Sequence, residues 1–135
     1  MCVTPPPQVF QPKLAPVIIK LKDSYNIWQK YLAIFPKANR FTLGSKTDDI
    51  FLNTIEYCYL ASYANTSERL LLLDRGIARL DLLKLLIQLA WEIKALTADN
   101  YIAISQSLSE AGKMLGGWKK SIQQKTPEIS REKTK

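Results

Sequence analysis

The carboxylates that lie closest together in this sequence are Asp48 and Asp49, followed two helical turns later by Glu56. Paired carboxylates can act as general acid and base when both point into the same space. Adjacent residues on a helix instead point about 100° apart, because one turn holds about 3.6 residues. Acidic residues near the start of a helix are also ordinary complements of its dipole. We therefore interpret these residues as structural.

The residue types that most often carry catalysis are absent or isolated. The sequence has no histidine, so it lacks the commonest general base and metal ligand. It contains no Gly-x-Gly-x-x-Gly or Walker loop. Cys2 and Cys58 have neither the number nor the spacing of a disulfide framework or a metal site. We expect Cys58 to be a small core residue, and we expect no enzyme activity, no cofactor and no metal.

The charge of the chain is strongly positive. Lys and Arg number 19 against 12 Asp and Glu, which gives a net charge of +7 and a pI near 9.5. This excess favours an anionic partner, either nucleic acid or an acidic protein surface. The alternative interpretation is that the charge serves solubility alone.

The length of 135 residues predicts one domain, with a segment at each end that has no packing pattern. Residues 1–15 contain four prolines and are predicted to be an extended, polyproline-like leader, or alternatively a ligand for another domain. Residues 125–135 are predicted to be a disordered basic tail. The folded domain is therefore expected at residues 16–124.

Two helices are predicted in the first half of the domain. Pro16 suits the first position of a helix, and apolar residues at three- and four-residue spacing continue to Phe35. Pro36 then disfavours helical geometry in the residue before it, so the helix should end near residue 34. The second helix is expected to begin between residues 39 and 45 and to end near residue 64. Ser45-x-x-Asp48 resembles a capping signal for it.

The third helix, predicted for residues 66–96 with Thr66 as its N-cap, is apolar nearly all round. One set of its residues could fill a bundle core: Leu70, Leu73, Ile77, Leu80, Ile87 and Trp91. A second set points elsewhere, and we expect five of its leucines to form an interface between subunits: Leu71, Leu72, Leu82, Leu86 and Leu89. Tyr59 and Tyr63 of the second helix also fall outside its apolar stripe, as tyrosines at partner surfaces often do.

The last helix is predicted to open at Thr97 and to carry an apolar stripe that ends at Trp118 and Ile122. Three glycines in it would each cost about 1 kcal/mol relative to alanine. Such glycines indicate the close approach of another backbone or the end of the helix. We expect one group of residues near its end to be structural: Gly112, Leu115, Gly116, Gly117 and Trp118.

Four helices joined by short loops must pack antiparallel to their neighbours, which predicts an all-α, antiparallel up-down-up-down four-helix bundle. The N-terminus lacks the basic and apolar regions of a secretory signal. Charged residues interrupt the most apolar stretch, residues 70–96, so no membrane span is expected. We therefore expect a cytoplasmic protein.

Three segments together resemble a known family. They are Phe-Pro-Lys-Ala-Asn-Arg-Phe-Thr-Leu-Gly at residues 35–44, the leucine-rich residues 82–90, and Gly-Lys-Met-Leu-Gly-Gly-Trp at residues 112–118. With the bundle plan, they resemble the accessory variability determinant (Avd) proteins of diversity-generating retroelements. They are also similar to a family of four-helix proteins encoded in intervening sequences of bacterial ribosomal RNA genes. The resemblance covers roughly residues 16–122.

The resemblance implies a non-enzymatic bundle that assembles into a barrel-shaped pentamer. Avd-like proteins bind the retroelement's reverse transcriptase and its template RNA, and so support error-prone cDNA synthesis. Two positions depart from the family pattern: Gln88 stands where a basic residue is common, and Lys113 stands where arginine is common. Lysine keeps the charge but loses the bidentate fork of arginine.

The basic residues expected to bind RNA or the reverse transcriptase lie on two helices. On the third helix, Arg75 and Arg79 are four residues apart and share a face, whereas Lys84 lies about 140° round from Arg79. On the first helix they are Lys20, Lys22 and Lys30. We expect these six to form a positive surface repeated around the oligomer. The alternative is that all six are solvated charges with carboxylate neighbours.

Two other functions stay open on the sequence. One is a four-helix protein of the ribosomal intervening-sequence type, whose role is unknown and which has no reverse-transcriptase partner. The other is a helical adaptor that binds another protein through a leucine-rich groove and never contacts RNA.

Overall fold

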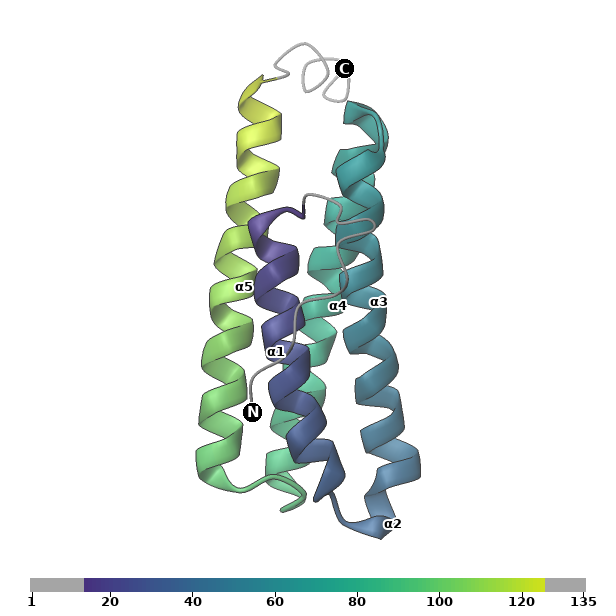
Figure 1. Cartoon of the computed structure of the whole chain (residues 1–135), viewed down its shortest axis with the longest axis vertical. Helices are drawn as coiled ribbons and strands as arrows, with labels where there is room; N and C mark the ends of the chain where they lie inside the picture. Colours follow the sequence, from purple (N-terminus) through teal and green to yellow (C-terminus); the bar gives the residue numbers. More distant parts are fainter. Residues whose placement is uncertain (1–13, 126–135) are drawn as a thin grey trace, which may run out of the picture.

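The computed structural model describes residues 14–125, and these fold into four long helices (Figure 1). The helices are α1 (Pro16–Ala33), α3 (Ser45–Tyr63), α4 (Thr66–Glu92) and α5 (Ala98–Lys125). A short helix α2 (Lys37–Asn39) and a π-helical segment η1 (Arg40–Gly44) link α1 to α3. Residues 14–125 contain no strand, so the all-α four-helix prediction is confirmed. The predicted leader and tail fall almost entirely outside the described residues.

The four long helices occupy the corners of a bundle. α3 packs against α4, α4 against α5, α5 against α1, and α1 against α3. In Figure 1 the links between successive long helices lie at alternate ends of the molecule, and α4 runs behind α1. Helices α1 and α4 are therefore diagonally opposite, so their solvent faces point away from each other.

The core is built on residues that recur every three or four positions. On α4 the buried positions are Leu70, Leu73, Gly76, Leu80, Leu83, Ile87 and Ala90. This set corrects the predicted core of that helix at two positions, since Ile77 is only half-buried and Trp91 is exposed. Trp91 instead stacks on Tyr101 of α5 at the surface, with ring centroids 5.1 Å apart. Gly76 brings α3 close: a Cβ there would lie 3.6 Å from Cys58 Sγ.

Two residues of the Phe-Pro-Lys…Arg segment, Phe35 and Arg40, stabilise the link between α1 and α3. Phe35 is buried edge-on against Trp28. Arg40 Nη2 donates hydrogen bonds to the carbonyl oxygens of Ala33 and Phe35, at 3.2 Å each. These carbonyls belong to the end of α1, where a helix has no partners of its own. The arginine therefore caps α1 from the following element.

The predicted capping signal at Ser45 and Asp48 is wrong. η1 runs directly into α3, and Gly44 already has helical geometry (φ −60°, ψ −48°), so α3 has no free start to cap. Asp48 Oδ1 instead accepts hydrogen bonds from Trp28 Nε1 at 3.1 Å and Gln29 Nε2 at 3.0 Å, which join α3 to α1.

The ends of α4 also differ from the prediction. Its N-cap is Asn65 and not Thr66, because the Asn65 side chain accepts from the backbone N–H of Glu68 at 3.0 Å. It ends at Glu92, four residues before the predicted end. Lys94 adopts a left-handed conformation (φ 67°), and the N–H groups of Ala95 and Leu96 both donate to the carbonyl of Ala90. This is the hydrogen-bonded turn that commonly terminates helices, here formed without glycine.

Candidate functional site

The residues that could have carried chemistry serve the fold. Asp48 of α3 is held against α1 by hydrogen bonds from Trp28 and Gln29. Burial and, to a smaller extent, a hydrogen bond between Tyr25 and Asp48 raise the pKa of Tyr25 to about 12. Cys58 is fully buried, and burial raises the pKa of its thiol to about 12, which keeps it protonated and unreactive. In residues 14–125, no three His, Cys, Asp or Glu side chains gather as a metal site would require.

The most extensive candidate surface is an apolar row on the outside of α4. Its positions alternate four and three residues apart, which keeps them on one face of the helix. We call it the α4 stripe, and it consists of Leu71, Arg75, Ala78, Leu82, Leu85 and Leu89. Leu71 is 50% exposed and Leu85 is 59% exposed. The stripe lies on the opposite side of α4 from the core positions, so α4 has two apolar faces, and within residues 14–125 only one of them is covered.

The five leucines predicted as an interface divide between this stripe and its edge. Leu71, Leu82 and Leu89 belong to the stripe. Leu72 and Leu86 are half-buried and lie beside it, where they pack against the core. The five omit Leu85, the most exposed leucine of α4, although the apolar pattern already directs it away from the core with the other outward leucines. Leu85 is seven residues from Ala78, which is seven residues from Leu71, and this spacing places all three in one row.

A second, shorter apolar row lies on the outside of α3. We call it the α3 stripe, and it consists of Leu52, Glu56, Tyr59 and Tyr63, again at spacings of four, three and four. The rings of Tyr59 and Tyr63 meet edge to face with centroids 5.1 Å apart. Their hydroxyl hydrogen bond raises the pKa of Tyr63. Tyr63 is 63% exposed, so this pair of rings covers the surface of α3 without entering the core.

The three predicted cations of α4 do not share one surface. Arg75 is exposed and lies within the α4 stripe, and Arg79 is half-buried beside it. Lys84 lies on the side that faces α5, where a Cβ placed on Gly112 would be 3.0 Å from its Nζ. Asp74, which could have neutralised Arg75, instead pairs with Lys119 of α5 at 2.5 Å.

The three predicted cations of α1 lie on the far side of the bundle from the α4 stripe. Lys20 pairs with Glu110 of α5 at 2.6 Å, and this contact lowers the pKa of Glu110. Lys22 and Lys30 are exposed, and neither forms an ion pair within residues 14–125. One subunit therefore presents its predicted cations in separate groups, which only an assembly could combine.

The predicted structural group on α5 includes both packed and exposed positions. Leu115 is fully buried, and Gly112 allows Leu80 and Lys84 of α4 to approach α5. Gly116 and Gly117 are exposed, and a Cβ on either would meet no described atom within 4 Å. Close approach within the chain therefore occurs at Gly112 and not at the glycine pair.

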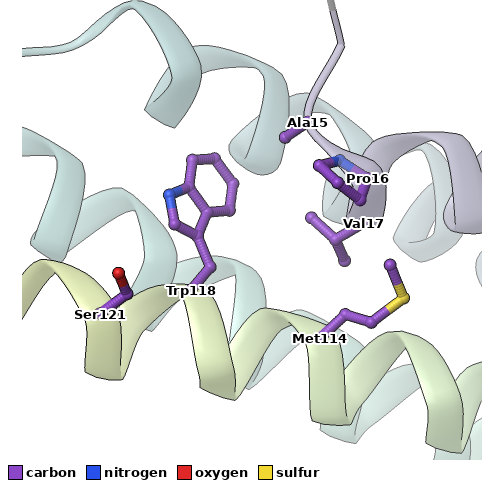
Figure 2. A pocket seen from close by; sticks show the side chains of 6 residues that line it. All are labelled: Ala15, Pro16, Val17, Met114, Trp118 and Ser121. Carbon is purple, nitrogen blue, oxygen red and sulfur yellow. The ribbon is translucent and has the colours of Figure 1, made fainter.

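Trp118 is half-buried at the edge of a surface hollow between α5 and the start of α1 (Figure 2). The hollow has a volume of about 380 Å³ and is lined by Ala15, Pro16, Val17, Met114, Trp118 and Ser121. In Figure 2 the indole ring points across the hollow toward Ala15 and Pro16. The ring therefore covers the N-terminal end of α1 and does not belong to the central core.

Two comparisons bear on the whole chain. A family model described as bAvd-like matches residues 18–122, which is nearly all of the bundle. No curated protein matches the sequence. Separately, none of the helices within residues 14–125 has the length and apolar composition required to cross a membrane.

Proposed function

The chain belongs to the bAvd-like family and is an Avd-type accessory protein, and we propose that it oligomerises and binds a retroelement reverse transcriptase together with its template RNA. In this function the protein contributes binding surfaces, and the polymerase carries out the mutagenic cDNA synthesis. The observation that carries the proposal is the family match over a bundle with uncovered apolar rows on α3 and α4.

The proposed assembly is a homopentamer of the 15.4 kDa chain. Its support is the α4 stripe, because a helix with apolar residues on two faces is normally covered on both. A monomer would leave Leu71, Leu85 and Leu89 in water. Contiguous exposed apolar surface of this kind marks a protein contact. Light scattering coupled to size exclusion measures the mass, and a monomer at micromolar concentration would rule out this part of the proposal.

The proposed RNA contacts are the cations that an oligomer repeats around its surface. Lys22 and Lys30 are the best placed, because they are exposed, lie eight residues apart on α1, and have no carboxylate paired to them in the described part of the chain. Lys20, Arg79 and Lys84 are half-buried and would contribute from the edges. Single phosphate contacts are weak, but several neutralised together bind strongly and with a marked salt dependence.

The test is a double charge reversal on α1. Lys22→Glu with Lys30→Glu should weaken RNA binding by at least tenfold at about 150 mM salt, and should reduce the salt dependence of the remaining binding. Lys37→Glu with Lys46→Glu changes the net charge equally at two other exposed lysines and is the matched control. Equal binding by the two variants would show that net charge, and not the α1 surface, attracts the RNA.

Genomic context distinguishes this function from the two alternatives. A neighbouring reverse-transcriptase gene with a template and variable repeat pair would support it. A position inside a ribosomal RNA gene would indicate the intervening-sequence type. If the gene lies in neither context, the helical adaptor is the function that remains.

A further inference from the structure

We infer that the α4 stripe of one copy packs against the α3 stripe of the next copy, with Arg75 of the first paired to Glu56 of the second. The inference rests on the proposed assembly and specifies which surfaces form it. Both surfaces are mostly apolar and repeat at spacings of three and four residues, and all their members except the half-buried Leu82 are exposed on the described part of the chain.

The charges of the two stripes are complementary. The α4 stripe contains one charged residue, Arg75, and the α3 stripe contains one, Glu56. Neither side chain forms an ion pair or a hydrogen bond within residues 14–125. A charge in an apolar contact is strongly unfavourable once it is covered, unless an opposite charge meets it there. Two parallel copies of the α4 stripe would bring their Arg75 side chains together, and two antiparallel copies would cover each Arg75 with no opposite charge, because the stripe contains no acidic residue. The α3 stripe is therefore the better partner.

The two charges also lie at matching heights. α3 ends at Tyr63 and α4 begins at Thr66, so both heights can be measured from the same end of the bundle. Glu56 lies about 10 Å and Arg75 about 14 Å from that end, at about 1.5 Å per residue. Copies related by rotation about an axis along the bundle keep these heights. Arg75 of one copy can therefore reach Glu56 of the next without a shift along the helices.

The same geometry brings apolar residues together at the opposite end of the molecule. Leu85 and Leu89 lie beyond the level at which α3 begins, at about the height of the η1 segment. Phe41 of η1 is 83% exposed, the highest value among the large apolar side chains of the described residues. In the assembly Phe41 of one copy is level with Leu85 and Leu89 of the other.

The arrangement is head to tail, and contacts of this kind form a ring when the rotation between successive copies closes. Each copy uses α4 toward one neighbour and α3 toward the other, so the two contacts of a copy involve different surfaces. These helices occupy adjacent corners, whose outer faces point roughly at right angles in a four-helix bundle. Each contact thus turns the next copy, and a small number of copies completes the ring. Helices α1 and α5 stay uncovered, which leaves Lys22 and Lys30 free.

The experiment is a charge swap measured by light scattering coupled to size exclusion over a range of micromolar concentrations. Arg75→Glu alone and Glu56→Arg alone should each lower the mass toward that of a monomer. The double variant Arg75→Glu with Glu56→Arg should restore the wild-type mass. Circular dichroism checks that helicity is unchanged throughout. Lys22→Glu and Asp23→Arg reverse exposed charges on α1 and should leave the mass unaltered.

Each outcome separates the pairing from the assembly itself. A monomeric wild-type protein would remove the oligomer and the inference with it. An oligomeric wild type whose mass is unaffected by both single reversals would overturn the pairing alone. The pairing also fails if both single variants dissociate and the double variant does not reassemble, because Arg75 and Glu56 would then contact other groups.

Discussion

At the scale of single residues, the five glycines of the chain differ in what surrounds them. A Cβ on Gly44 would lie 3.0 Å from Leu32 Cδ1 and 3.4 Å from the carbonyl oxygen of Asn39, so a side chain there would press on Leu32 and require it to shift. A Cβ on Gly116 or Gly117 would meet nothing within 4 Å. Glycine is the costliest ordinary residue in a helix interior apart from proline, and no contact with residues 14–125 offsets that cost at Gly116 or Gly117.

We therefore expect Gly116→Ala with Gly117→Ala to raise the free energy of unfolding by about 1 to 2 kcal/mol, since each exchange removes roughly 1 kcal/mol of helix penalty. Urea unfolding at a fixed chain concentration measures the change, because assembly also contributes to stability. Gly44→Ala is the contrasting variant and should destabilise. If the glycine pair is instead destabilised by alanine, its neighbours lie in another subunit. A more stable protein that no longer binds RNA or polymerase would place these glycines at a partner surface.

Individual residues were predictable from the sequence only where one helical face determines their environment. The burial of Cys58 and Leu115 follows from their apolar periodicity, and both are buried as predicted. The N-cap of α4 was misassigned by one residue, because Asn65 and Thr66 are adjacent and both residue types are favoured at an N-cap. The ion pair of Asp74 with Lys119 joins two helices, and no spacing along a single helix could reveal it.

At the scale of the helical elements, the connections are stabilised by side chains that lie outside the helices they cap. In the link from α3 to α4, Arg69 Nε donates to the carbonyl of Ala61 at 2.8 Å. Its Nη2 donates to the carbonyls of Ser62 and Ala64, at 3.4 and 3.1 Å. These are the carbonyls that the end of α3 leaves without partners. Arg69 thus serves α3 as Arg40 serves α1.

Arg69→Lys should lower the free energy of unfolding by about 2 kcal/mol, because hydrogen bonds from a charged donor contribute about 1.5 to 3 kcal/mol and an ammonium cannot reach three carbonyls at once. Thermal and urea unfolding measure the loss. Arg79→Lys is the matched control, since Arg79 makes no hydrogen bond or ion pair within residues 14–125 and lies outside the α4 stripe, so the exchange should leave unfolding nearly unchanged. Equal effects at the two positions would mean that Arg69 does not cap α3.

The sequence predicted where helices exist better than where they end. Four apolar patterns of period 3.6 gave four long helices, because burying one face of each requires that spacing. The end of α4 was misplaced by four residues, since the apolar pattern continues through Ala95 and Leu96 after the backbone has turned at Lys94. Those two residues are buried by the turn and not by a helix. Hydropathy alone cannot distinguish residues buried by a turn from residues buried on a helix.

At the scale of the whole molecule, the leucines expected at an interface lie on or beside one outer row of α4, whereas the cations expected to bind RNA do not share a single surface of the chain. The excess of leucine on α4 is visible in the sequence, because one helix cannot bury two faces in a four-helix bundle. The relation between α1 and α4 is not visible, since helical periodicity does not specify which corner each helix occupies. The structure places these helices diagonally, which separates Lys22 and Lys30 from Arg75.

Assembly and folding should therefore be separable by changes at neighbouring leucines of α4. Leu85 is 59% exposed in the α4 stripe, whereas Leu83 is fully buried in the core. Leu85→Ser should leave helicity intact and lower the mass toward a monomer. Leu83→Ser should unfold or strongly destabilise each subunit, because loss of a buried leucine costs about 2 to 5 kcal/mol. The proposed assembly has several subunits binding RNA together, so it predicts that the Leu85 variant binds RNA about 100-fold or more weakly although its cations are unchanged. Circular dichroism, light scattering and a filter-binding titration of the two variants measure the three properties. RNA binding that survives in a proven Leu85→Ser monomer would show that one subunit is sufficient, and the contacts would then have to lie within a single bundle.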